Sequence, residues 1–191
     1  MTPTDFEVGA REVVENYWRI RAALRLLVPR GIAATTKLQF DGIPQLGTMT
    51  GLLQNETIAE THASLGAYAT TRLSRDMFVA LIALFERRLV ARLLAAGGGA
   101  SGTLGGLQRS VQRLVSVPTN LIEDLDEVRE RRNAQMHHDG HAHDKYIDAA
   151  LKVHGRSPQH VALVPVGTLV IPDGNYLTYA ADALVRYSTA I

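Results

Sequence analysis

Residues 77–96 read MFVALIALFERRLVARLLAA, and this stretch decides the fold class. Its apolar side chains recur at spacings of three and four residues, which is the period of one face of an α-helix. The pattern predicts a helix that starts at a Ser74 cap and ends at the glycines of 97–99, because serine caps the first turn and glycine favours the end of a helix. We expect it to be the central core helix, with an inward face made of Met77, Phe78, Leu81, Ile82, Phe85, Leu89 and Leu93.

Similar spacing predicts further helices before and after this one. Pro29 and Gly31 should stop the first of them, because proline and glycine interrupt helices. Asn120 with Glu123 three residues later resembles a capping box, which marks a helix start. Residues 31–65 are less regular and give only a weak helical pattern. The expected ranges are 13–28, 49–62, 104–116, 120–138 and 175–189.

A different pattern precedes the last helix. Residues 160–175 read HVALVPVGTLVIPDGN, and such β-branched and apolar text with proline and glycine interruptions predicts a short β-hairpin or an extended arm. The final helix should direct Tyr176, Tyr179 and Tyr187 into the core. Their helical spacing favours core packing over stacking on the bases of a nucleic acid. The chain is therefore predicted to be all-α, an up-and-down helical bundle with this arm before the C-terminal helix.

The composition predicts one soluble domain over residues 1–191. The chain is 46% hydrophobic and only 20% charged, which suits a single packed core. It has no cysteine, so disulfides and thiolate sites are excluded, and its net charge of +1 gives no global field for nucleic acid. The N-terminus does not resemble a secretory signal, and charges from Glu86 to Arg92 interrupt the most apolar window. We expect a cytoplasmic protein that does not enter a membrane.

Residues 130–144, ERRNAQMHHDGHAHD, concentrate the side chains that could perform chemistry. At about 100° per residue, Arg132 falls on the same helical stripe as Leu125 and Val128. An arginine on an apolar stripe needs a partner or a functional role, because burying its charge alone is costly. His137 lies about 140° around the axis and ~7.5 Å further along, so the two side chains do not converge in an unbroken helix. They could meet if the helix ends or kinks between them, or across a two-fold axis between two copies.

The stretch LDEVRERRNAQMHHDG, residues 125–140, resembles the signature of the HEPN superfamily of helical domains. In that signature an arginine is followed by a polar residue and then, after a few positions, by a histidine; here these are Arg132, Asn133 and His137. In that superfamily a core helix with an acidic residue precedes the motif helix. Here the segment LIALFERRL, which contains Glu86, has that position. In one branch a β-like run and a terminal helix follow the motif, like residues 161–189. Residues 31–65 match no such pattern.

The resemblance implies a metal-independent endoribonuclease, often a toxin or an antiphage effector, that cuts RNA as a homodimer. His137 would transfer a proton at the ribose 2′-hydroxyl or the 5′-oxygen, since an imidazole titrates near neutral pH. Arg132 would grip the scissile phosphate, and Asn133 would orient either partner or contact RNA. The ribose supplies the nucleophile, so no cofactor or metal is implied. A cognate antitoxin protein is a possible partner.

Some superfamily members bind RNA or nucleotides without cutting, so a non-catalytic binding module with a partner protein remains the alternative. One branch carries a tyrosine two residues after the motif histidine where a partner enzyme modifies it, and this chain has Asp139 there. Three residues are expected to support the site: Glu86, His138 and Arg131. Glu86 would pair with Arg132, although Arg88 or solvent are other places for it.

Two plainer interpretations compete with the catalytic one. Cations such as Arg131 and His138 are favoured near a helix C-terminus by about 0.3–1 kcal/mol each, which explains their clustering without any chemistry. The histidines of 137–143 with Asp139 and Asp144 could also bind a transition metal if Asp148 or His154 joined them. The arginines of 87–92, Arg109 and Arg113 could form a basic rim for RNA or a solvated helix face.

Overall fold

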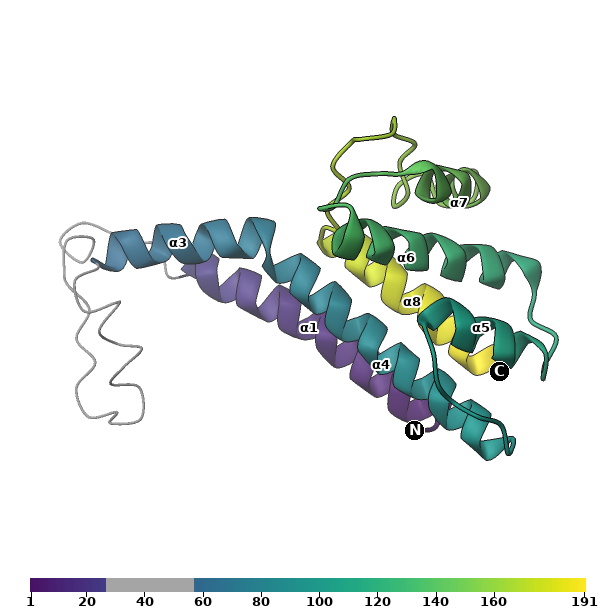
Figure 1. Cartoon of the computed structure of the whole chain (residues 1–191). Coiled ribbons are helices and arrows are strands. Elements are labelled where there is room, and N and C mark those ends of the chain that lie inside the picture. Colours follow the sequence, from purple (N-terminus) through teal and green to yellow (C-terminus); the bar gives the residue numbers. More distant parts are fainter. Residues whose placement is uncertain (27–56) are drawn as a thin grey trace. The chain divides into compact units, whose positions relative to one another are not determined.

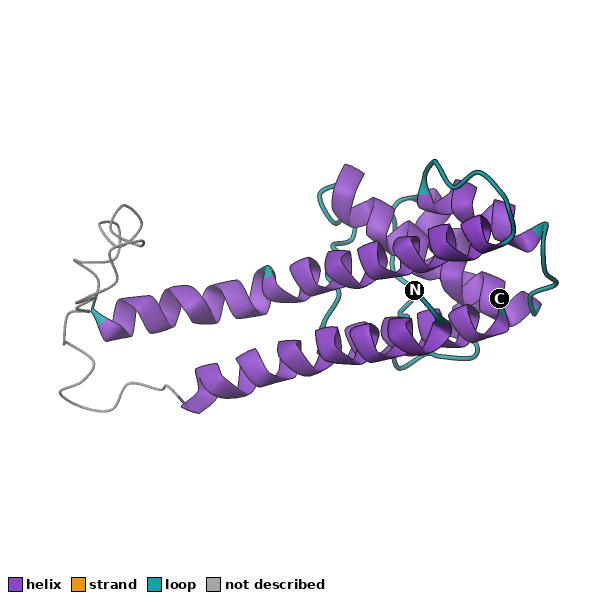
Figure 2. Ribbon diagram, turned by 90° about the horizontal axis from the view of Figure 1, so that it is seen from below, coloured by secondary structure: helices purple, strands orange, loops and turns teal. Residues whose placement is uncertain are grey.

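The computed structural model describes residues 1–26 and 57–191, and these residues are helical with no β-strand among them (Figures 1 and 2). The predicted stops at Pro29 and Gly31, and the part of the 49–62 helix before residue 57, lie outside the described residues. The described helices are α1 (Pro3–Leu26), α3 (Ile58–Thr71), α4 (Leu73–Ala95), α5 (Leu104–Gln112), α6 (Thr119–His137), α7 (Asp144–His154) and α8 (Gly174–Ala190).

The chain divides into two compact units. The larger one joins Met1–Tyr17 to Ser74–Ile191, and the smaller one is Trp18–Leu73. In the smaller unit, the end of α1 is tied to α3 by a bond from Arg21 to the Ala69 carbonyl (3.1 Å). A capping box at Thr57 starts α3. The expectation of one domain over 1–191 stays a prediction.

The core of the larger unit forms around α4, as the apolar period of 77–96 predicts. Phe85 is fully buried, and its ring packs against Phe6 of α1 (5.6 Å between centroids) and Tyr187 of α8 (5.7 Å). Phe78 packs edge-on against Tyr176 at 5.7 Å. The predicted inward tyrosines of α8 are buried, so core packing is confirmed for them. Within this unit the prediction of a helical bundle is therefore confirmed.

Helix α7 is absent from the sequence-based prediction. Its buried residues Tyr146, Ala149, Ala150 and Val153 follow the spacing of an amphipathic helix, and Nδ1 of His143 accepts a bond from the Tyr146 amide to cap it. Two of those four apolar positions are alanines, and a histidine is an uncommon cap. The local signal was therefore weak.

The predicted β-hairpin before the last helix is wrong. Residues 155–173 form an irregular connection that pairs with the segment between α6 and α7 and not with a second strand of its own. Ala142 donates to the Thr168 carbonyl and Val170 donates to the Gly140 carbonyl, each at 2.8 Å. These bonds surround a single bridge between His141 and Leu169. Pro165 and Pro172 have no amide hydrogen to donate, which works against a regular ladder.

Two predicted helix caps are also wrong. Helix α4 begins at Leu73, so Ser74 lies inside it and is buried. Helix α6 begins at Thr119 with Pro118 in the cap position and no side-chain capping bond, so Asn120 belongs to the first turn. A proline suits a helix start because the first amides have no helical acceptor. Within residues 1–26 and 57–191, no helix combines the length and the apolar character needed to cross a membrane.

Candidate functional site

Helix α6 buries a wider arc than the sequence indicated, and this changes which arginine is inside. Arg131 is 6% exposed, whereas Arg132 is half-buried. The prediction that Arg132 occupies the inward stripe is therefore wrong, and the neighbouring Arg131 is the buried arginine. The physical reason is that α6 packs against both α7 and α8, so two neighbours cover two sides of it.

Arg131 is held by a buried polar cluster. Its Nε donates to Glu127 (3.0 Å), its Nη2 donates to the hydroxyl of Tyr146 (2.6 Å), and its guanidinium carbon lies 3.7 Å from the centroid of the Tyr176 ring. The Tyr176 hydroxyl donates to the other oxygen of Glu127 at 2.8 Å. Burial raises the pKa of Glu127 and brings the pKa of Tyr146 to about 12. Arg131 thus stabilises the packing of α6, α7 and α8, and it does not line the pocket that holds Arg132.

Arg132, Asn133, His137 and His138 all line one surface pocket of about 740 Å³. Its walls come from the start of α5, the second half of α6 and the start of α7. The remaining charged lining residues are Arg109, Arg129, Glu130, Asp144 and Lys145, so cations outnumber carboxylates. Such a surface favours an anionic ligand.

The two motif residues keep the separation that helical geometry predicts. Helix α6 runs without a break through His137, and the chain turns only afterwards, with His138 as the C-cap and Gly140 at a φ of 83°. Arg132 and His137 therefore contribute to the same pocket from different positions around the helix, and no bond joins them within the described contacts. A kink between them, one of the routes considered for bringing them together, is not present in α6.

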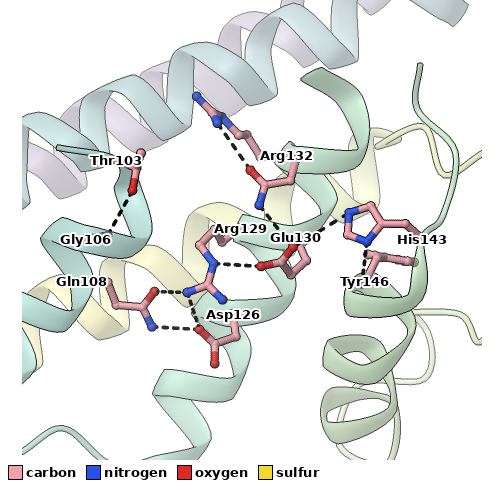
Figure 3. A network of polar contacts seen from close by, with 10 residues as sticks. Thr103, Gly106, Gln108, Asp126, Arg129, Glu130, Arg132, His143 and Tyr146 are labelled. Atoms are coloured by element: carbon pink, nitrogen blue, oxygen red, sulfur yellow. Dashed lines mark hydrogen bonds and ion pairs between the residues drawn. The ribbon is translucent and has the colours of Figure 1, made fainter. Parts of the chain in front are cut away.

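A short chain of polar contacts fixes the motif asparagine (Figure 3). Asn133 Nδ2 donates to Glu130 Oε2 at 3.2 Å, and Asn133 Oδ1 accepts from Arg132 at 3.4 Å. Because an ionised carboxylate only accepts, the amide nitrogen must face Glu130 and the amide oxygen must face Arg132. Glu130, 7% exposed, also accepts from Arg129 Nε at 3.0 Å. Sequence reasoning did not single out Glu130, whose role depends on which face of α6 is covered.

The two pocket cations on α6 differ in how far their charge is compensated. Arg129 is paired with Asp126 (2.8 Å) and Glu130, and it donates to Gln108 (2.6 Å). Arg132 has no ion pair among the described residues, and its one bonded partner is the neutral Asn133. The predicted pairing of Arg132 with Glu86 is not formed, and Glu86 does not line the pocket. The charge of Arg132 is therefore uncompensated inside the pocket.

His143 is a pocket residue that the catalytic prediction missed. Its ring lies 4.3 Å from that of His138. Its Nε2 lies 3.9 Å from Glu130 and is buried, with no hydrogen-bond partner among the described residues. Burial, with the neighbouring His138, lowers its pKa. Since Nδ1 accepts the Tyr146 amide, the ring proton of neutral His143 must be on Nε2. The one sequence signal for His143 was its position directly before the apolar helical pattern of α7.

Two further histidines, His141 and His154, bond to nearby backbone carbonyls. His141 Nδ1 bonds the His138 carbonyl at 3.1 Å, and His154 Nδ1 bonds the Val161 carbonyl at 2.8 Å. In the part of the chain that the structure describes, no three histidine or acidic side chains are grouped so that they could hold a metal ion. The geometry thus gives no support to the metal-site interpretation.

The predicted basic rim is only partly assembled. Arg109 lines the pocket, but Arg88 is 5% exposed and donates to Ser188, and Arg92 bonds the carbonyl of Ile191. Those two arginines therefore connect α4 with the C-terminal end of the chain. Arg113 is exposed and lies outside the pocket lining.

The fold and the pocket define a helical protein with a basic, histidine-lined surface site. No protein-family model, curated protein or solved structure matches the chain. What the site does must therefore follow from its own residues.

Proposed function

We propose that this protein is a metal-independent endoribonuclease of the HEPN type, acting as a homodimer. The observation that carries the proposal is the uncompensated guanidinium of Arg132 in the same pocket as His137, His138 and His143. A fixed positive charge beside imidazoles, which can accept and donate protons, is the combination that phosphodiester cleavage requires. A role as a toxin or antiphage effector, with a cognate antitoxin, belongs to the same proposal.

The reaction uses the substrate's own nucleophile. A base takes the proton of the ribose 2′-hydroxyl, the 2′-oxygen attacks phosphorus, and the bond to the 5′-oxygen breaks as an acid protonates that oxygen. A cyclic phosphate and a free 5′-hydroxyl result. His137 performs one of the two proton transfers, and Arg132 stabilises the charge that develops on the phosphoryl oxygens. Asn133, fixed by Glu130, orients the guanidinium of Arg132.

The second proton transfer needs another histidine. In a homodimer, the partner copy's His137 supplies it if the two pockets meet at the symmetry axis, as in an isologous interface. His143 is not suited to this role, because its Nδ1 is occupied by the Tyr146 amide and its Nε2 carries the proton in the neutral form. Giving up that proton would leave an unfavourable imidazolate.

The test is cleavage of structured and unstructured RNA by the purified protein in excess EDTA. Wild type should cut, and Arg132→Ala and His137→Ala should each lose at least about a hundredfold in rate, as expected when a charge stabiliser or an acid–base group is removed. Arg113→Ala and His141→Ala are matched controls outside the pocket and should keep wild-type activity.

The other outcomes decide against parts of the proposal. RNA binding without cleavage by a folded protein would favour the alternative, a non-catalytic binding module. Cleavage that EDTA abolishes would contradict a metal-independent mechanism. If the protein is a toxin, its expression should arrest growth, and His137→Ala should relieve the arrest.

A further inference from the structure

A second cavity, of about 270 Å³, is lined by residues of α6, α7, α8 and the irregular connection 155–173 that joins α7 to α8. It shares no lining residue with the proposed RNA site. The chemistry of its lining is unusual, since a buried arginine, an aspartate and several apolar side chains face the same small space. The proposed nuclease function uses none of them.

Arg131 lines this cavity with part of its hydrogen-bonding capacity unused. Nε and Nη2 are engaged with Glu127 and Tyr146, and Nη1 has no acceptor among the described residues. Arg131 is 6% exposed, so a ligand in the cavity lies beside a guanidinium with donors to spare. The stacking of the guanidinium on Tyr176 holds it in place.

Asp173 adds the opposite charge to the lining of the cavity. It is exposed, and its Oδ1 caps α8 by accepting the Tyr176 amide at 2.7 Å. Its second oxygen has no partner among the described residues. His160 adds a further polar atom, since its Nδ1 is buried with no hydrogen-bond partner among the described residues while its ring stacks on Tyr179. A donor on Arg131 and an acceptor on Asp173 thus line one cavity.

The remaining wall is apolar and incompletely covered. Val164, Leu169 and Ile171 come from the irregular connection, and Leu169 is 52% exposed. Apolar side chains left partly in water beside a cavity gain free energy when a ligand covers them, by about 25 cal/mol per Å² of apolar surface. The wall therefore suits a ligand with an apolar body.

We infer that this cavity binds a free α-amino acid with an apolar side chain. Its carboxylate accepts from the unused N–H groups of Arg131, its ammonium group meets Asp173, and its side chain covers the wall of Val164, Leu169 and Ile171. A simple anion fits less well because it would meet the charge of Asp173 with Glu127 nearby. A neutral apolar molecule would leave the Arg131 donors desolvated and unpaired, which is costly.

Calorimetric titration of the full chain tests this with three probes that differ by one charge each. Phenylalanine should bind at millimolar concentration or better. Phenylalaninamide, which lacks the carboxylate, and 3-phenylpropionate, which lacks the ammonium group, should each bind at least about tenfold more weakly. Equal binding of 3-phenylpropionate and phenylalanine would overturn the role of Asp173. Absence of binding by phenylalanine would overturn the proposal.

Substitutions that should preserve the fold test whether phenylalanine binds in this cavity. Asp173→Asn removes the charge but retains an oxygen that can cap α8, and it should weaken phenylalanine binding at least about tenfold. Asp182→Asn is the matched control, because Asp182 is an exposed α8 residue outside the cavity. Val164→Trp should fill the cavity and abolish binding without a large change in melting temperature. Unchanged binding by Val164→Trp would place the ligand elsewhere.

Discussion

Arg131 and Arg132 are adjacent in sequence but differ in their surroundings. Arg131 is enclosed by Glu127, Tyr146 and Tyr176, and burial opposes its charge while Tyr176 and Glu127 raise its pKa. Arg132 remains at the pocket with a neutral bonding partner. A step of about 100° around the helix is enough to move a side chain from a covered side to an open one. One arginine is therefore buried between α6, α7 and α8, and its neighbour lines the surface pocket.

The buried pair should show its energetic role when one member is removed. Glu127→Ala leaves the Arg131 charge buried without its carboxylate, so we expect a loss of about 3–5 kcal/mol in the free energy of unfolding, measured by urea denaturation. The double change Glu127→Leu with Arg131→Met should cost less than the single change. As a control, Asp182→Ala breaks an exposed pair with Arg186 and should cost no more than about 1 kcal/mol. A Glu127→Ala loss as small as that of the control would contradict the assignment.

His143 predicts a pH dependence of stability whose sign follows from its lowered pKa. Burial and His138 disfavour its charged form, against the opposite influence of Glu130 and Asp144. The folded state therefore binds a proton less readily than the unfolded state. The resulting stability is present above the ordinary pKa of 6.5 and is lost as the pH falls through the lower folded value.

The variant His143→Asn isolates this contribution, because asparagine can cap α7 but does not titrate. Its free energy of unfolding should fall less than that of wild type between pH 8 and pH 5, measured by urea denaturation at each pH. His141→Asn is the control, since His141 is an exposed histidine of the same segment that caps no helix. If His143→Asn keeps the wild-type slope, another group is responsible.

At the scale of elements, the turn after α6 packs against the connection 155–173, and this packing depends on the absence of a side chain at Gly140. This glycine has a φ of 83°, and an added Cβ would lie 3.1 Å from Leu169 Cδ1 and 3.4 Å from the buried side chain of Gln135. Gln135 in turn donates to the Val170 carbonyl at 2.8 Å. Gly140 therefore allows both the turn after the motif helix and the docking of the connection.

Two alanine variants separate the cost of the left-handed backbone conformation from the cost of the new side-chain contact. Gly167 has nearly the same backbone conformation, with a φ of 84°, but a Cβ added there would meet no atom within 4 Å. Gly167→Ala should lose about 1–2 kcal/mol for the left-handed conformation alone. Gly140→Ala should lose more, because Leu169 and Gln135 must also move. Equal losses in thermal or urea unfolding would show that the connection absorbs the added methyl group.

At the scale of the whole molecule, the proposed homodimer makes a prediction about mixed subunits. Because the proposed centre needs His137 from both copies, a dimer that joins a wild-type subunit to a His137→Ala subunit should be inactive. Random exchange of equal amounts leaves only a quarter of the dimers fully wild type. About a quarter of the activity of the same total amount of wild type should therefore remain, against about half when the two proteins do not exchange.

The measurement is RNA cleavage after unfolding and refolding wild type and His137→Ala together, with separately refolded proteins as the control. Analytical ultracentrifugation gives the oligomeric state of each sample. A monomer, or a jointly refolded mixture that keeps half of the wild-type activity, would contradict a centre built from two copies.

The sequence by itself determined the helical character of the chain. The apolar period of 77–96 predicted the core helix, and the spacing of Tyr176, Tyr179 and Tyr187 predicted an inward face of α8. Such periods are local, because residues three and four apart share a helix face whatever surrounds them. The composition of 130–144 also located the pocket residues Arg132, Asn133, His137 and His138.

Only the tertiary structure decided which side of α6 is covered. Burial of Arg131, the placement of Glu130 and the inclusion of His143 depend on α7 and α8 packing on α6, and those contacts join residues distant in the chain. The connection 155–173 likewise has the composition of strands but pairs with the segment between α6 and α7, because its available hydrogen-bond partners are there. Local sequence patterns carry no information about such distant partners. Which helices pack against each other is therefore seen only in the tertiary structure.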